Sequence, residues 1–110
     1  MLTGFFIEII PAATPANANY TTDFINVLSY SMAAVQFIGA SLDTNDGVIK
    51  LQDSLDGSNW NDISGMSLTI TAGASVNMLR VPNLTGAYLR AVWTKGTNTT
   101  GTVTAKIILK

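Results

Sequence analysis

The chain has 110 residues, a net charge of −1, and neither cysteine nor histidine. This length fits one domain whose core needs no metal or disulfide. The lack of His and Cys excludes Ser-His-Asp and Cys-His catalysis and the usual zinc sites. We therefore expect no enzyme, no catalytic residue, no cofactor and no metal. Charged residues make up only 12% of the chain, about half of the ~25% usual in soluble domains.

The basic residues are scattered along the chain and form no cluster that would neutralise a phosphate backbone. We therefore expect no nucleic-acid partner. No apolar run approaches the ~20 residues of a membrane helix, so we expect no membrane span. The N-terminus has no basic segment and carries Glu8 within its apolar stretch, unlike a signal peptide. Assembly into a virion released by lysis is one route out of a cell that needs no such signal.

The first predicted strand covers residues 4–10, which are mostly β-branched and aromatic. Pro11 ends this predicted strand, and an Ala-, Pro- and Asn-rich connector follows over residues 11–22. Two roles are open for the strand: an ordinary first strand of its own domain, or one that pairs with the edge of a neighbouring subunit. We therefore separate residues 1–22 from a sandwich domain over 23–110. The candidate interface residues are Phe5, Phe6, Ile7 and Ile9.

Short apolar or alternating segments predict further strands near residues 23–31, 33–40, 48–53, 60–63, 66–71, 74–81, 87–95 and 102–110. The nearly apolar segment 33–40 favours a central strand buried on both faces. In residues 87–94 the odd positions share one face and the even positions, including Tyr88 and Arg90, share the other. About eight short strands separated by turn signals predict an all-β chain, an antiparallel β-sandwich of jelly-roll type.

The acidic residues favour turns over chemistry. Residues 43–47 resemble a calcium loop but miss the required spacing, so we expect a hairpin turn there. Asp53, Asp56 and Asp62 could formally supply a carboxylate pair for acid–base catalysis, yet their places beside turn glycines favour turn-forming roles.

Two interpretations are open for the large aromatic residues. Trp60 and Trp93, with the tyrosines, would either form a sugar-stacking platform or fill the core of the sandwich. Trp60 follows a turn and opens a strand, which favours a core-capping role.

Residues 47–63 contain the pattern Ser-x-Asp-Gly-x-x-Trp, which resembles the strand–turn–strand hallmark of discoidin-like jelly rolls. Residues 87–93 are similar to the aromatic-x-Arg strand of that family. Residues 101–107 resemble the last strand of small proteins often encoded among phage structural genes. The resemblance leaves out residues 1–32 and transfers no sugar site. The residues that it places in the motif turn and the core are Ser54, Asp56, Gly57, Trp60, Tyr88, Arg90 and Trp93.

The resemblance implies a virion structural protein, either a capsid-decorating or auxiliary capsid protein or a subunit of a head fibre or spike. We expect it on the exterior of a bacteriophage particle. Its partners would be further copies of itself, with a trimer favoured, and other virion proteins. The alternative is a carbohydrate-binding module that attaches to host glycans, and a third reading is an accessory domain of a larger cellular assembly.

Overall fold

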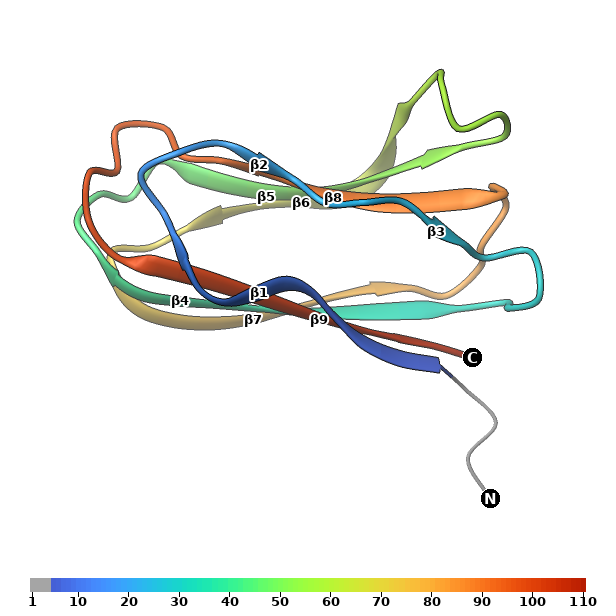
Figure 1. Ribbon diagram of the computed structural model, residues 1–110, viewed down its shortest axis with the longest axis horizontal. Coiled ribbons are helices and arrows are strands. Elements are labelled where there is room, and N and C mark those ends of the chain that lie inside the picture. The colour runs from blue at the N-terminus through green and yellow to red at the C-terminus, as the bar shows by residue number, and fades with distance from the viewer. Residues whose placement is uncertain (1–4) are drawn as a thin grey trace.

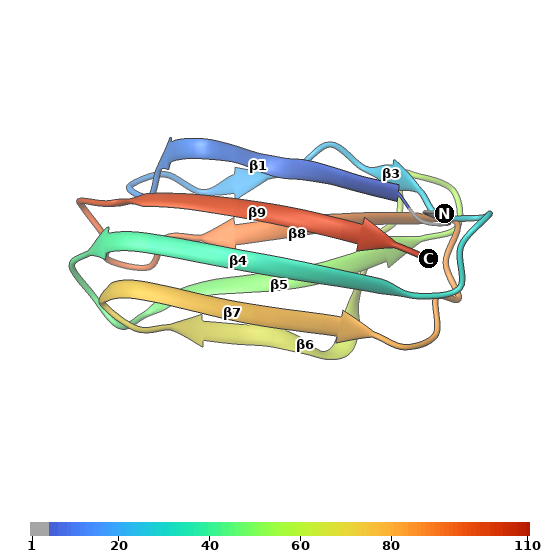
Figure 2. The same ribbon diagram turned by 90° about the horizontal axis from the view of Figure 1, so that it is seen from below.

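Two antiparallel sheets pack face to face (Figures 1 and 2). The computed structural model describes residues 5–110, with side chains from Ile7 onward. The described strands are β1 (Phe5–Pro15), β2 (Tyr20–Thr21), β3 (Ile25–Asn26), β4 (Ala33–Leu42), β5 (Gly47–Ser54), β6 (Asn61–Ile70), β7 (Gly73–Val81), β8 (Tyr88–Thr94) and β9 (Thr102–Leu109).

One sheet has four strands in the order β1-β9-β4-β7. The other has five: β2-β8-β5-β6 form its path, and β3 also pairs with β8. This arrangement confirms the predicted all-β sandwich. The described residues contain no helix long and apolar enough to cross a membrane.

Alternation along the strands builds the core. In β4, β8 and β9 every second side chain is buried between the sheets and its neighbours are half-buried on the outer faces. Segment 33–40 was predicted to be buried on both faces, and this was wrong, because the outer face of its sheet has no covering layer within the described residues. The alternation predicted for residues 87–94 is confirmed.

Trp93 is the largest fully buried side chain and joins both sheets. Its ring stacks on Phe37 of the opposite sheet, with 5.2 Å between centroids and 28° between planes. Its Nε1 donates to the Ala16 carbonyl at 3.3 Å. A Cβ atom at Gly47 would lie 2.2 Å from Trp93 Cη2, so only glycine fits beside the indole.

The first strand is longer than predicted, because β1 continues through Pro11 to Pro15. It lies at the edge of its sheet and pairs only with β9, so proline at its open side costs no ladder hydrogen bond. Register shifts between Glu8 and Ile10 and between Ile10 and Thr14 accommodate the irregular part. Here β1 and β2 pair within their own chain, and exchange between subunits stays a prediction.

The strand predicted over residues 23–31 is much shorter, because only Ile25 and Asn26 pair with β8. Between β2 and β3, hydrogen bonds of Thr22 take the place of regular strand pairing with β8. Its N–H donates to the Ala91 carbonyl and its Oγ1 accepts from the Ala91 N–H, both at 3.0 Å. Residues 23–24 therefore lie at the edge of the five-stranded sheet without regular strand pairing.

Two predicted strands, 60–63 and 66–71, are one strand, β6, with a register shift opposite residues 50–52. The predicted hairpin turn at residues 43–47 is instead a crossover, because β4 and β5 belong to different sheets. Asp46 ties this crossover to the β8–β9 loop, where its carboxylate accepts the Thr97 N–H at 3.0 Å and the Thr97 hydroxyl at 2.7 Å. Asp43 accepts the Thr99 N–H and hydroxyl in the same way.

These contacts make stability depend on pH. Hydrogen bonds, first from the Thr44 hydroxyl and then from Thr97, lower the pKa of Asp46 from 3.8 to about 2. Since the folded pKa lies below the unfolded one, the carboxylate stabilises the fold fully above about pH 5, and this contribution is lost as pH falls through about 2. Urea denaturation should therefore show the stability gap between the native chain and Asp46→Asn shrinking between about pH 4 and pH 2. A gap that stays constant over this range would contradict the role of the Asp46 charge.

Candidate functional site

The turn between β5 and β6 is held by hydrogen bonds to Ser54 and Asp56. The buried Ser54 Oγ accepts the N–H groups of Asp56 and Gly57 at 3.2 and 2.9 Å, and donates to Asp56 Oδ1 at 3.0 Å. The same Oδ1 accepts the N–H groups of Ser58 and Asn59 at 2.9 and 2.8 Å. These contacts give the turn a defined shape up to the start of β6.

The predicted turn-forming roles of Asp56 and Gly57 agree with this geometry. Gly57 has a φ of 78°, the left-handed conformation that favours glycine. Hydrogen bonds from the backbone of Asn59 and then of Ser58 hold the pKa of Asp56 well below its usual range. The carboxylate is therefore charged at neutral pH and serves as the acceptor that closes the turn.

An aromatic cluster of Phe24, Trp60 and Tyr88 lies beside this turn on the outer face of the five-stranded sheet. The Phe24 ring meets Tyr88 edge-on, with centroids 5.2 Å apart and planes at 74°, and it meets Trp60 with centroids 5.6 Å apart. A Cβ atom at Gly57 would lie 3.6 Å from Phe24 Cζ and 3.8 Å from Tyr88 Cδ2. The turn thus supports the cluster from one side.

Trp60 was predicted to cap the core, but it is half-buried in this outer cluster. The reason is local: the residue precedes β6, so the alternation of the strand does not decide where its side chain points. Trp93 lies in the core as predicted. Phe24 was missed as a member of a site, and its only signal is a large apolar side chain in a segment between two very short strands.

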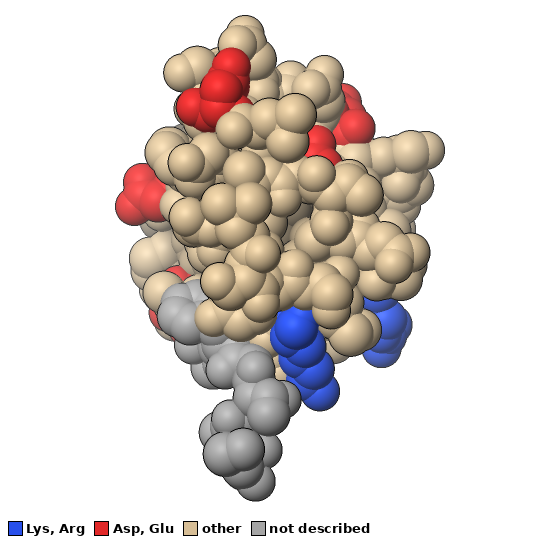
Figure 3. Space-filling model, turned by 90° about the vertical axis from the view of Figure 1, so that its right-hand side faces the viewer, with Lys and Arg blue, Asp and Glu red and all other residues tan. Residues whose placement is uncertain are grey.

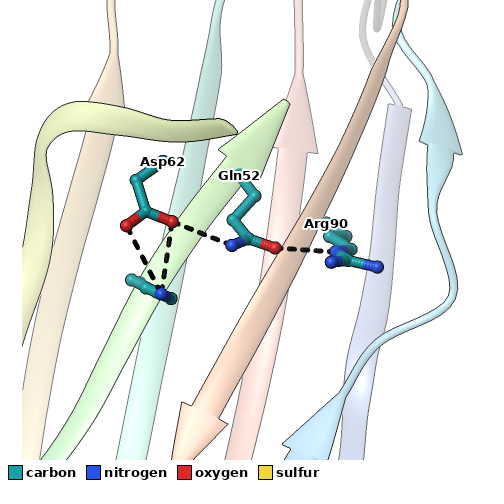
Figure 4. A network of polar contacts seen from close by, with 4 residues as sticks. Gln52, Asp62 and Arg90 are labelled. Atoms are coloured by element: carbon teal, nitrogen blue, oxygen red, sulfur yellow. Dashed lines mark hydrogen bonds and ion pairs between the residues drawn. The ribbon is translucent and has the colours of Figure 1, made fainter. Parts of the chain in front are cut away.

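A polar row crosses three strands next to the aromatic cluster (Figure 4). Gln52 on β5 donates from Nε2 to Asp62 Oδ1 on β6 at 2.8 Å, and its Oε1 accepts from Arg90 Nε on β8 at 2.8 Å. Register places these side chains together, since Gln52 pairs with both Asp62 and Arg90. Lys50 closes the row with an ion pair to Asp62 at 3.2 Å.

Arg90 joins the polar row to the aromatic cluster. Its guanidinium carbon lies 4.2 Å from the centre of the Trp60 ring, a cation–π distance. Within the described part of the chain, its terminal nitrogens donate no hydrogen bond. Tyr88 and Arg90 share the outer face, as the alternation predicted.

The charges in this row offset one another. Hydrogen bonds from Gln52 and then from Lys50 lower the pKa of Asp62. Its carboxylate pairs with the Lys50 ammonium, whereas Gln52 separates it from Arg90. Figure 3 shows that the adjoining end of the sandwich is mostly uncharged, with separate acidic side chains over its upper part and sides and basic side chains near its lower edge. The site therefore offers aromatic and hydrogen-bonding groups without a strong field of either sign.

A hollow of about 210 Å³ continues from Phe24 towards β1. It is lined by residues of β1 and of the β2–β3 segment, among them Ile7, Ile9, Tyr20 and Asp23. Two of the candidate interface residues, Ile7 and Ile9, thus line a hollow between the sheets. The side chains of Phe5 and Phe6 lie outside the described residues.

The acidic side chains do not assemble into a metal site. Within residues 5–110, no group of three or more Asp or Glu side chains is arranged to hold a metal ion. Asp53 lines a separate polar hollow with Asn61 and Thr85 at the same end of the sandwich. Asp56 and Asp62 are each engaged by hydrogen-bond donors of the turn and the row.

No protein-family model matches the sequence, and a search of curated proteins finds no match. Solved structures do match. A chain described as "CBM4 structure and function" is 14% identical, with a TM-score of 0.52, over 96% of this chain and 66% of that one. The C-terminal domain of a chitobiase from Bacteroides fragilis is 18% identical, with a TM-score of 0.50, over 84% of this chain and 63% of that one.

A third match comes from a study in which "Bacillus endospore appendages form a novel family of disulfide-linked pili". It is 12% identical, with a TM-score of 0.55, over 97% of this chain and 85% of that one. The chain spans just under two thirds of the length of the first two structures. At these identities the likeness shows a shared fold: this chain is a β-sandwich like the three structures compared.

The turn can be tested through Ser54. Replacing Ser54 with Ala removes the oxygen that accepts two N–H groups in a buried position. We expect the free energy of unfolding to fall by about 1–2 kcal/mol, and acrylamide to quench Trp60 fluorescence more strongly. Ser58→Ala is the matched control, because Ser58 contributes only its backbone N–H to the turn. Equal effects of the two substitutions would contradict this account.

Proposed function

We propose that the protein is a non-enzymatic binding module that holds a neutral oligosaccharide on the outer face of its five-stranded sheet. The observation that carries this proposal is the contact between the aromatic cluster and the polar row, joined by Arg90 over the Trp60 ring. A sugar has apolar C–H faces and hydroxyl edges, so a binding surface needs rings beside fixed donors and acceptors. Both are present here on the outer face of the five-stranded sheet.

The rings supply the stacking surface. Phe24 is 53% exposed although it packs against two other aromatic side chains. A large exposed aromatic group loses apolar contact with water when a ligand covers it. The Arg90 guanidinium holds the Trp60 ring in place, so the surface is ordered before a ligand arrives and little side-chain entropy is lost on binding.

The polar row supplies hydrogen bonds. The Asp62 side chain is 62% exposed and has acceptor capacity beyond its contacts with Gln52 and Lys50. The Arg90 guanidinium has donors beyond its bond to Gln52. Because the Lys50 ammonium pairs with the Asp62 carboxylate and Arg90 donates to the neutral Gln52, acidic and basic sugars both gain little from charge, which favours a neutral glycan.

The likeness to the chain described as CBM4 supports this choice, because the same sandwich occurs in a carbohydrate-binding module. The contacts of the described residues make the argument specific to this chain. Binding to host glycans is also the alternative that the sequence left open.

Isothermal titration against a panel of neutral oligosaccharides tests the proposal. A shallow surface of this kind should bind with a Kd between about 10 μM and 1 mM. Phe24→Ala and Trp60→Ala should each weaken binding about tenfold, since each removes a stacking ring.

Leu55→Ala is the matched control, because Leu55 is an exposed apolar residue of the same turn outside the aromatic cluster. Thermal melts of each variant separate loss of binding from loss of folding. No measurable binding to any neutral oligosaccharide, or equal losses in the Leu55 variant, would reject the proposal.

Assembly is a second candidate function, and the pilin-like neighbour is the observation that favours it. Under this hypothesis the chain is a structural subunit. Its place on the exterior of a virion stays a prediction. Contacts would come from sheet edges and from Phe5, Phe6, Ile7 and Ile9. Light scattering separates the two candidates: a discrete trimer or larger ring supports assembly, whereas a monomer that binds glycans contradicts it.

A further inference from the structure

The edges of the two sheets differ in how well they are protected. A strand at an edge presents unpaired N–H and C=O groups that can pair with another chain unless bulges, prolines, charges or short length prevent it. Within the described residues, β1 and β7 lie at the edges of the four-stranded sheet, while β6 and the β2–β3 segment lie at the edges of the five-stranded sheet (Figure 2).

Three of these edges carry protective features. The first strand has two register shifts and two prolines, Pro11 and Pro15. On the opposite sheet, β6 has a register shift and carries the charged Asp62. Both β2 and β3 are only two residues long. None of these edges offers a long, regular row of backbone groups.

The fourth edge, β7, has one register shift against β4, confined to its first residues, opposite the stretch between Gly39 and Leu42, and it is regular over the rest of its length. Its pairing with β4 runs without a shift from Ala33↔Val81 to Gly39↔Ser75. The strand contains no proline, and Arg80 near its end is its one charged residue. On its outer face, Val76 is 65% exposed and Met78 is 39% exposed. This edge is therefore regular, apolar and nearly uncharged.

We propose that β7 pairs antiparallel with β7 of a second copy of this chain, which joins the two four-stranded sheets into one. The charge distribution favours this partner. A pairing centred near Asn77 sets Arg80 of each copy opposite Ala74 of the other, so the two guanidinium groups lie at opposite ends of the shared ladder and do not repel strongly. Residues opposite each other in an antiparallel pair share a face, so Val76 and Met78 of both copies meet on the outer side.

This arrangement leaves the aromatic cluster free. Antiparallel pairing keeps each sheet face on the same side in both copies, so the two five-stranded sheets would present their outer faces in one direction. If that face binds glycans as proposed above, the pair binds a polymer at two points and gains avidity. The pairing itself is carried by β7 and does not depend on the glycan site.

The shared edge is short. A strand of this length spans about 30 Å, and a single strand-to-strand contact buries less than the ~1,200 Å² of a standard stable interface. The dimer should therefore form reversibly, with a Kd above about 1 μM.

Sedimentation equilibrium of the full chain over a range of concentrations tests the pairing. We expect a monomer–dimer equilibrium that Val76→Lys weakens at least about tenfold, because it places two like charges beside the shared ladder. Thr21→Lys is the matched control, since it puts the same charge at an exposed position of the opposite edge of the sandwich, on β2, and should leave the Kd unchanged. A chain that stays monomeric at all concentrations, or a dimer unaffected by Val76→Lys, would overturn the proposal.

Hydrogen exchange locates the contact without any substitution. Amide groups of β7 should gain protection as protein concentration rises, whereas those of β1 should not. Gain of protection at β1 alone would overturn the proposal and favour the N-terminal strand as the interface. Both experiments are done without glycan, so a failure of glycan binding leaves their outcome untouched.

Discussion

The stacking of Trp93 on Phe37 across the two sheets is the contact on which the rest of the structure depends. It requires glycine at position 47, where any Cβ atom would collide with the indole. Because Trp93 points inward from β8, alternation turns Tyr88 and Arg90 outward. The core and the candidate site are thus the two faces of one strand, and a change in the register of β8 would disturb both.

Low charge shapes the outer face as much as the core does. Hydrogen bonds through Gln52, more than ion pairs, connect Asp62 on one strand with Arg90 on another. Such a row holds its side chains in place while leaving the surface close to neutral. Among the structures compared, this fold occurs both in a chain described as CBM4 and in a chain from a study of pili. The sandwich alone therefore does not distinguish between functions, and the support for one of them comes from the residues on this face.

Local rules predicted the sandwich, most strands and the outward direction of Arg90, because alternation depends only on neighbours in sequence. They failed where tertiary context decides. The polar row needs the register between β5 and β8, whose contacting residues are 38 positions apart. Trp60 precedes its strand and so escapes the alternation rule. A proline ends a strand inside a sheet, but Pro11 lies in an edge strand, and such a strand can continue through it. The virion placement came from a resemblance, and none of the structures compared is described as a virion protein.

Nuclear magnetic resonance titration of the isotope-labelled chain with a neutral oligosaccharide tests whether the outer face of the five-stranded sheet binds glycan, since Trp60 and Trp93 give separate indole N–H signals. We expect the Trp60 signal and the backbone signals around Gln52 and Arg90 to shift progressively, while the Trp93 signal stays in place. Shifts confined to the four-stranded sheet, or no shift at saturating glycan, would contradict glycan binding at this face.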